Sequence, residues 1–588
     1  HQVLKELASF CVTLPGREQA LSIRQLKDMG GAGAAYREYA ELVRVIKERG
    51  RFPLAGVTDI RPWLSKLGPT NAYLLPEEFL SINVCLCASE SIRQLQNEQF
   101  SKLYPLLSSL IDVISDESAL IREIGRVFDE KGEIRDSASP ELLRIRKEVR
   151  SIKARAKELV DFFLNDKRTK EILQEEIVTI REDRYVLLVT AGRQAEFPGI
   201  VHGRSNTGAT YFIEPLKLVE VNNKLAILRK EEKEEEIAVL RSLSASVLSR
   251  RGALNAILEA LVKLDCIQAK TLFAEAYSAH IPKLKDAGDV RFFSARHPLL
   301  AINEASGGRK AVPVDILTGE AKKALVISGA NTGGKTVALK SLGLLSLLAS
   351  SGIPVTASED SEAVFFSTIF ADIGDRQDIT ASLSTFSGHI KRIGSFLDAA
   401  GQGSLVLIDE IGIGTDPQEG AAFALAAMET FVNAGAFIAV TTHLNLLKAH
   451  AETNPEYLNV AVEFDEKSLK PLYRLCYGSP GPSLGLSIAS SLGMPLALIE
   501  RARSYISEKE GAFMESIKRL GEEREKVERI KERALFIEEK REEAIRKLKD
   551  ERAKILDKAV KKVDDIVNDA RAEAAKIIEG LKEATPPI

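Results

Sequence analysis

The chain has 588 residues, too many for a single hydrophobic core, so several domains are expected. Its 81 basic and 84 acidic residues leave a net charge of -3, which excludes a global positive field for nucleic acid and leaves only local patches. The five scattered cysteines form no CxxC pair, which predicts a reduced protein without structural zinc. No apolar run approaches the roughly 20 residues of a membrane span, and no secretory pattern opens the chain, so a cytoplasmic protein without membrane contact is expected.

The first half of the chain changes from helical to extended patterns and back. Residues 1–138 carry apolar residues at spacings of three and four, which predicts a helical core domain. A long amphipathic helix is expected next, with Ser139 as its N-cap and Pro140 at its first position. Over residues 176–215, β-branched and polar residues alternate between turn signals, which predicts a small antiparallel sheet.

A second long helix is expected over about 215–250. Two long helices around a small β unit describe a lever that carries a lobe, and residues 139–250 are assigned to it. An ordinary α+β domain is the alternative, which periodicity alone does not separate from a lever. Returning core helices are expected over residues 251–290.

From residue 291 the pattern becomes strands that alternate with helices. Strands are expected at 324–328, 405–409 and 436–441, which predicts a largely parallel sheet covered by helices. The α/β domain is assigned to residues 291–507.

Residues 508–588 are rich in charge and predict a long C-terminal helix. Its heptad-like seam is interrupted by Arg541 and Glu551, so an imperfect coiled coil is expected, with a solvated single helix as the alternative. The seam residues are Val527, Ile530, Ala534, Ile537, Ala544, Leu548 and Ile555.

The segment GANTGGKT fits the phosphate-loop pattern G-x-x-x-x-G-K-[ST]. It follows an apolar strand and opens a helix, the context that this pattern requires, whereas a glycine turn without function is the alternative. Backbone N–H groups of such a loop converge on the phosphates of ATP, and the helix N-terminus adds its positive end. Lys335 supplies a positive charge and Thr336 a hydroxyl for Mg²⁺. The predicted nucleotide-binding residues are Gly329, Ala330, Asn331, Thr332, Gly333, Gly334, Lys335, Thr336 and Val337.

Two further strand ends carry candidate catalytic residues. The apolar run before Asp409 and Glu410 predicts that a buried strand delivers Asp409 to the magnesium shell, where Glu410 polarises the attacking water. Without the phosphate loop, this acidic pair would be read as surface charge. His443 follows another apolar strand and is predicted to sense the γ-phosphate, with a structural histidine as the alternative.

These motifs resemble the MutS family of ATPases and, within it, the MutS-two branch. The resemblance is nearly full-length and rests on ARHPLL, GANTGGKTVALK, FADIGDRQDITASLSTFSGH, LVLIDEIGIGTDPQEGAA, TTHLNLLKAHA and LYRLCYGSPGPSLGLSIASSLGMPLALIERA. It implies a multidomain fold with an all-α core, long lever helices that bear a small β clamp lobe, an α/β phosphate-loop ATPase domain of the ABC class, and a C-terminal coiled coil.

The resemblance also implies cofactors and a partner. ATP and Mg²⁺ are the expected cofactors, and two ATPase domains are expected to form a homodimer in which Ser384 faces the partner's γ-phosphate. Without the resemblance, the segment around Ser384 would be read as a polar helix cap. Ala330 stands where the branch usually has proline, and because the loop donors are backbone N–H groups, the site is expected to survive this change.

The two ends of the chain depart from the family pattern. The mismatch-reading domain of ordinary MutS has no counterpart, so mismatch recognition is not expected. Members of the branch continue past the coil into a KOW module and an Smr-type domain, whereas this sequence stops in the coil, so nuclease activity is not expected of it.

Two functions follow from the resemblance. The first is a dimeric ATP-hydrolysing clamp on branched or recombination-intermediate DNA, and the alternative is an ATPase that engages and splits stalled or collided ribosomes. A transporter or chromosome-structuring ATPase is disfavoured because LSGGQ and a membrane span are absent from the sequence. The lobe offers four arginines for phosphate contacts, with a solvated face as the alternative: Arg181, Arg184, Arg193 and Arg204.

Overall fold

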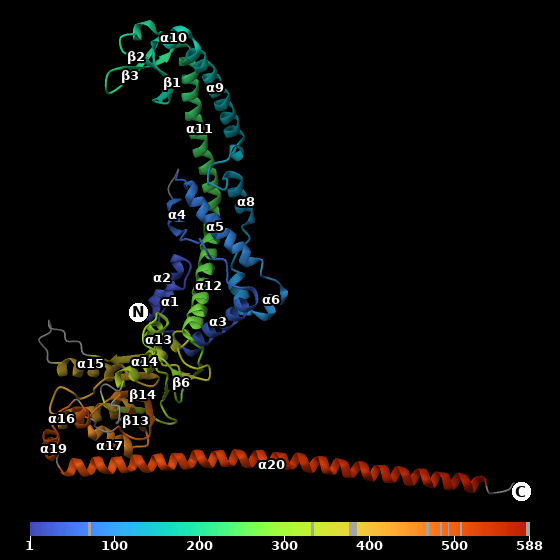
Figure 1. Ribbon diagram of the computed structural model, residues 1–588, viewed down its shortest axis with the longest axis vertical. Helices are drawn as coiled ribbons and strands as arrows, with labels where there is room; N and C mark the ends of the chain where they lie inside the picture. The colour runs from blue at the N-terminus through green and yellow to red at the C-terminus, as the bar shows by residue number, and fades with distance from the viewer. Residues whose placement is uncertain are drawn as a thin grey trace. The chain divides into compact units, whose positions relative to one another are not determined.

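The computed structural model describes residues 1–68, 72–330, 334–374, 385–465, 470–481, 485–491, 493–505 and 508–583. The chain divides into two compact units, residues 1–313 with 341–367 and residues 314–340 with 368–588. Figure 1 shows the elements of both units. Within the described residues, no helix combines the length and the apolar character that crossing a bilayer requires.

The first unit opens with packed helices of 6 to 21 residues, which the apolar spacing predicts as helical. Three of them begin at side-chain caps, since Thr13, Asp28 and Asn97 each accept a hydrogen bond from a backbone N–H of the first turn. The helices are α1 Gln2–Ser9, α2 Leu14–Ser22, α3 Met29–Arg49, α4 Arg61–Lys66, α5 Pro76–Arg93, α6 Glu98–Leu103, α7 Pro105–Ile111 and α8 Ser118–Val127.

Two long helices then pack side by side, α9 (Pro140–Asn165) and α11 (Leu216–Ser249) (Figure 1). Ser139 caps α9 as predicted, because its Oγ accepts a hydrogen bond from the Leu142 N–H at 3.0 Å. Figure 1 also shows the small β lobe at the shared end of these helices. The predicted lever with a lobe is therefore present.

The two lever helices are joined by apolar and ionic contacts. A small core between them contains Ile145, Val149, Leu225 and Leu228. Arg146 of α9 also donates hydrogen bonds to two glutamates of α11, and the ion pairs are Arg146–Glu232 at 2.8 Å and Arg146–Glu236 at 2.6 Å.

The lobe is the antiparallel sheet that the alternation predicts, with strand order β1-β2-β4-β3. Its core gathers Leu187, Val189, Phe197 and Ile213. The lobe comprises α10 Lys167–Ile172, β1 Leu173–Arg181, β2 Arg184–Thr190, β3 Gly199–Arg204 and β4 Thr210–Pro215.

After α11 the chain returns through one long helix, where several were expected. A small sheet with β9 between β5 and β6 follows in the same unit. These elements are α12 Arg251–Tyr277, β5 Lys283–Lys285, β6 Arg291–Ala295, α13 Pro298–Ala305 and β9 Glu362–Val364.

The second unit contains a six-stranded sheet with the order β10-β11-β12-β8-β13-β14. Neighbouring strands are parallel from β10 to β13, and only β14 runs antiparallel. The predicted strands are found within one residue, because long apolar runs mark strands buried on both faces. The strands of the unit are β7 Val314–Leu317, β8 Ala324–Ser328, β10 Thr368–Asp372, β11 Ser404–Ile408, β12 Phe437–Thr441, β13 Tyr457–Asp465 and β14 Lys470–Tyr477.

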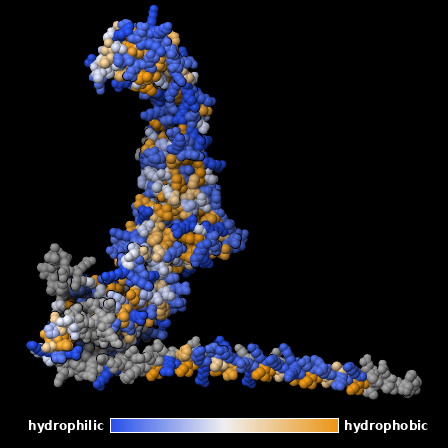
Figure 2. Space-filling model, viewed as in Figure 1, coloured by the Kyte–Doolittle hydropathy of each residue, from blue (hydrophilic) through white to orange (hydrophobic). Residues whose placement is uncertain are grey.

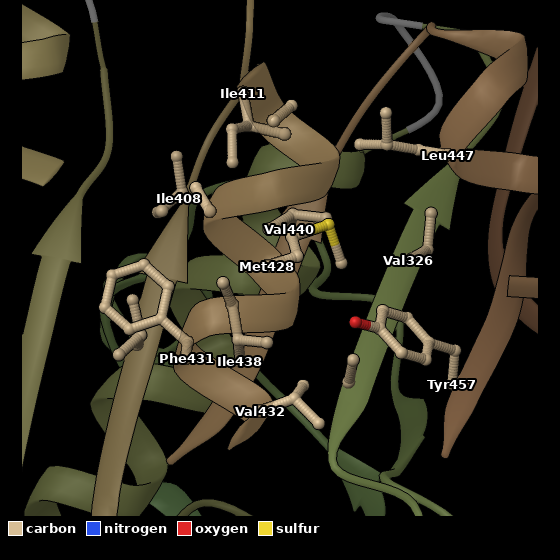
Figure 3. Close-up of a cluster of buried hydrophobic side chains, with 14 of the residues drawn as sticks. Val326, Ile408, Ile411, Met428, Phe431, Val432, Ile438, Val440, Leu447 and Tyr457 are labelled. Atoms are coloured by element: carbon tan, nitrogen blue, oxygen red, sulfur yellow. The ribbon is translucent and has the colours of Figure 1, made fainter. Parts of the chain in front are cut away.

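Helix α16 (Pro417–Asn433) packs on this sheet and forms its main core (Figure 3). Met428 and Phe431 of the helix lie against Ile408, Ile438 and other residues of neighbouring strands, all nearly inaccessible to solvent. The remaining helices are α14 Lys335–Ser350, α15 Thr385–Ala399, α17 Asn445–Thr453, α18 Gly485–Ser491, α19 Leu496–Ser504 and α20 Glu508–Glu583. Helix α20 is the predicted C-terminal helix.

Candidate nucleotide-binding site

The loop between β8 and α14 begins and ends in backbone that favours glycine. Gly329 has φ +123° and Gly334 has φ +101°, conformations that side chains with a Cβ rarely adopt. Ala330 directly follows Gly329 and Val337 lies exposed in the first turn of α14, whereas Asn331, Thr332 and Gly333 lie outside the described residues.

Lys335 is buried at the start of α14 and folds back onto the loop. Its Nζ donates a hydrogen bond to the Gly329 carbonyl at 2.9 Å and lies 2.8 Å from Nε2 of His443. Burial lowers the pKa of Lys335 to about 8, although Glu410 opposes this shift. Burial, together with the charges of Lys335 and Lys448, lowers the pKa of His443 to about 4. At neutral pH the imidazole is therefore uncharged, and its Nε2 can accept a hydrogen bond from the ammonium.

A chain of hydrogen bonds joins the acidic pair to two hydroxyls. Thr441, at the end of β12, donates from Oγ1 to Asp409 Oδ1 at 2.5 Å and accepts from the Glu410 N–H at 2.8 Å. Thr336 donates to the same Asp409 oxygen at 3.3 Å. Thr441 thus orients both acidic residues, a role that no sequence motif indicates.

Glu410 has a backbone conformation that is rare for its residue type. Its φ is +53°, in the left-handed region, and such residues cluster at functional sites. Its carboxylate lies 3.7 Å from Nε2 of His443, and both side chains are partly exposed, at 39% and 42%. The carboxylate is thus directed to the open side of the site, while Asp409 is buried.

Thr336 and Asp409 fit a magnesium ion by their chemistry. Magnesium prefers oxygen ligands and is usually held by one or two carboxylates together with substrate phosphates and water. The two side-chain oxygens already lie 3.3 Å apart at the end of the phosphate loop. A hydroxyl and a carboxylate match this requirement.

Ser384 lies outside the described residues, but the helix that follows it is described. Helix α15 is tied to the sheet by Asp372, which accepts hydrogen bonds from His389 Nδ1 and Arg392 Nε, both at 2.6 Å. The backbone carbonyl of Asp372 in turn accepts from the Asp409 N–H at 2.9 Å. This buried aspartate therefore connects α15 with the acidic strand end, a role that sequence spacing did not indicate.

Three more residues missed by the sequence analysis lie beside the phosphate loop. The ring of Tyr473 packs on Gly334, where an added Cβ would lie 3.1 Å from its Cδ1. Gly481 packs against Gly329, and its N–H donates to Ser328 Oγ at 2.8 Å. The buried ammonium of Lys448 lies 3.5 Å from the Gly481 carbonyl, and burial lowers the pKa of Lys448.

The four lobe arginines belong to the first unit and differ in their contacts. Arg184 donates to the buried carboxylate of Glu214 at 2.8 Å, and Arg193 pairs with Glu196 at the same distance. Burial alone would raise the pKa of Glu214, but hydrogen bonds from Asn222, His202 and Arg184 outweigh burial and lower it.

The other two arginines of the lobe are more open to a ligand. The guanidinium of Arg181 stacks over the ring of Phe212 at 4.6 Å, and Arg204 is exposed on β3.

The site combines a buried lysine and a threonine at the start of a helix with a pair of carboxylates at the end of a parallel strand. This combination is typical of an α/β domain of the nucleotide-binding type. The sequence profile of MutS domain V matches residues 325–510, which contain every residue of this site.

Proteins named Endonuclease MutS2 are similar to nearly the whole chain. The one from Geobacillus thermodenitrificans is 37% identical over 590 residues, which cover 99% of this chain and 74% of the relative. The one from Pelotomaculum thermopropionicum is 38% identical over 593 residues, with the same coverage, and the one from Brevibacillus brevis is 40% identical over 496 residues, with 84% and 62% covered. The chain belongs to the MutS family, in its MutS2 branch, as the sequence motifs indicate.

Proposed function

We propose that this chain is a dimeric, ATP-hydrolysing clamp that acts on branched or recombination-intermediate DNA without preference for mismatches. The observation that carries ATP hydrolysis is the convergence of four side chains beyond the carboxyl ends of β8 and β11, which lie on either side of β12 in the parallel sheet: Lys335, Thr336, Asp409 and Glu410. Ligands of open α/β sheets bind outside the carboxyl ends of the strands, which is where these side chains lie.

In this proposal each side chain has one task. Lys335 leaves the Gly329 carbonyl and pairs with the β- and γ-phosphates, while Thr336 and Asp409 hold Mg²⁺, which neutralises phosphate charge when bound. Glu410 accepts a hydrogen bond from the attacking water and orients it. Neutral His443 keeps one ring N–H for the γ-phosphate. The exposed ring of Tyr473 beside Gly334 offers a flat face for the adenine base.

The proposal includes a second chain that completes the site. Ser384 of one protomer contributes to the γ-phosphate site of the other, as the family resemblance implies. The attachment of α15 to Asp372 supports this arrangement, because it fixes the helix that begins directly after Ser384.

Nucleic acid as the ligand is supported by the relatives and by the lobe. The similar proteins are named endonucleases, enzymes that act on nucleic acid. In this chain we assign the phosphate contacts to the lever and lobe of residues 139–250, and chiefly to Arg181 and Arg204, because Arg184 and Arg193 are engaged in internal ion pairs.

A gel-shift titration over salt tests the proposed ligand. A four-way junction should bind more tightly than a linear duplex of equal length, because it offers phosphates from several arms to a dimer. Binding driven by counterion release should weaken with salt, with a log-log slope of roughly -0.9 per phosphate neutralised. A mispaired duplex should bind like a matched one.

Two outcomes would contradict this assignment. Equal affinity for the junction and the duplex would contradict branched DNA as the ligand. A chain that co-sediments with ribosomes but does not bind junctions would support the ribosome-splitting alternative. The junction should stay uncut with Mg²⁺ and ATP, and cleaved strands would place a nuclease within residues 1–588.

A further inference from the structure

Lys448 is a buried cation that the proposed mechanism does not use. Hydrophilic side chains cover much of the molecular surface (Figure 2), but Lys448, in the first turn of α17, is only 2% exposed. Its backbone is anchored, because the Lys448 carbonyl accepts a hydrogen bond from Nδ2 of Asn459 on β13 at 2.9 Å. From this anchored turn the ammonium reaches the Gly481 carbonyl, beside Gly329 of the phosphate loop.

The ammonium of Lys448 has little compensation for its burial. A lysine carries three N–H donors, yet among the described residues the Gly481 carbonyl is its one acceptor. Their separation of 3.5 Å exceeds the roughly 2.7–3.2 Å of ordinary hydrogen bonds. No carboxylate in the described part of the chain forms an ion pair with Lys448, and burial lowers its pKa. A buried charge is costly unless it is paired, so the contact with Gly481 does not account for this lysine.

The surroundings of Lys448 add further positive charge. Burial is the main cause of the low pKa values of Lys335 and His443, and the charge of Lys448 lowers both pKa values further. Lys448 also lies at the N-terminal end of α17, the positive end of the helix, where cations are disfavoured. Two ammonium groups and a helix N-terminus thus gather in one buried region, which favours a ligand with several negative charges.

We propose, on the basis of the ATP site inferred above, that Lys448 is a second cation of this site and stabilises the phosphates of bound ATP through its buried charge. Because water is largely excluded around the ammonium, its charge is weakly screened and acts on the phosphates without touching them. The γ-phosphate adds negative charge that ADP lacks. The charge of Lys448 therefore favours ATP over ADP.

The same charge has a cost before nucleotide binds. An ammonium that is withdrawn from water without an anion destabilises the folded chain, so an apolar residue of similar volume should stabilise it. A lysine kept only to anchor Gly481 would behave in the opposite way, because its removal would loosen a contact. The unfolding temperature therefore separates an electrostatic role from a structural one.

Lys448→Met in the full chain tests both consequences. Methionine keeps the unbranched shape of lysine but removes its charge. Without nucleotide, the variant should unfold at a higher temperature than the parent. Its Kd for a non-hydrolysable ATP analogue should rise about tenfold or more, with a smaller rise for ADP, as expected for a charge that acts through a weakly screened interior. Thermal unfolding and isothermal titration with Mg²⁺ provide these readouts.

The matched control is Lys340→Met, which makes the same change at an exposed lysine of α14 and should alter neither quantity. Unchanged affinity of Lys448→Met for the analogue, or an equal loss of affinity for the analogue and ADP, would overturn the proposal. A lower unfolding temperature would also overturn it, because it would identify Lys448 as a structural anchor.

Lys335→Ala, measured beside these variants, separates this proposal from the proposed ATP site. If Lys335→Ala binds the analogue like the parent, the proposed ATP site itself is wrong. If Lys335→Ala loses binding while Lys448→Met retains it, the ATP site stands and only the second cation is refuted.

Discussion

Glu410 combines an uncommon backbone with an open position in the site. A left-handed conformation costs a residue with a Cβ about 1–2 kcal/mol, and here it is held by the hydrogen bond from the Glu410 N–H to Thr441. Residues held in such conformations cluster at functional sites, and here the strained residue is the one whose carboxylate lies on the open side of the site.

Replacing Glu410 by glutamine tests its assignment as the water-orienting group. Glu410→Gln keeps the size of the side chain but removes its charge, so ATP should still bind while turnover falls at least ~100-fold, the range of general-base effects. Steady-state phosphate release and equilibrium binding of ATP measure the two quantities. The control is Glu419→Gln, at an exposed carboxylate in α16, and it should turn over normally. Normal turnover by Glu410→Gln would refute the assignment.

At the scale of elements, the segment after β14 restricts the phosphate loop. Gly481 lies so close to Gly329 that a Cβ on Gly481 would stand 2.9 Å from the Gly329 Cα and 3.0 Å from its nitrogen. Both obstacles are backbone atoms, which cannot rotate away as a side chain can. A residue with a side chain at position 481 must therefore displace the loop.

Gly481→Ala should weaken ATP binding by tenfold or more and destabilise the protein by about 1–3 kcal/mol, the usual cost of overpacking. Isothermal titration and thermal unfolding provide the readouts. Gly485→Ala is the matched control, because a Cβ there meets open space, and it should bind ATP like the parent. If Gly481→Ala also binds like the parent, the contact does not constrain the loop.

The sequence predicted elements better than it predicted contacts. The strands β8, β11 and β12 were found within one residue because each is an unbroken apolar run, and the loop and acidic pair follow them directly. Tyr473 and Lys448 could not be found in this way, since they lie more than 100 residues from the loop and reach it only through the sheet order. The ion pair between Arg184 and Glu214 was equally invisible, because it depends on the register of β2 with β4.

At the scale of the whole molecule, the proposed composite site predicts complementation between two inactive chains. Ser384→Ala alone and Lys335→Ala alone should each hydrolyse ATP slowly. In a mixture, the heterodimer has one site with the intact Lys335 of the first chain and the intact Ser384 of the second, so ATP turnover should partly recover. A mixture that hydrolyses no faster than either variant alone would indicate that each site is closed within one chain.

The chain enters the lobe from the end of α9 and leaves it at the start of α11, and these two helix ends are neighbours. The ring of Phe162 near the end of α9 lies 4.7 Å below the Nζ of Lys217 in the first turn of α11, so the chain returns almost to the point where it departed. A segment with adjacent ends is an interchangeable module, because closing the gap with a short turn costs little entropy. Residues 167–215 can thus be exchanged for a different unit by engineering, provided that the new unit also packs on Phe163 and Leu164 of α9 and replaces the contact of Tyr185 with the helix pair.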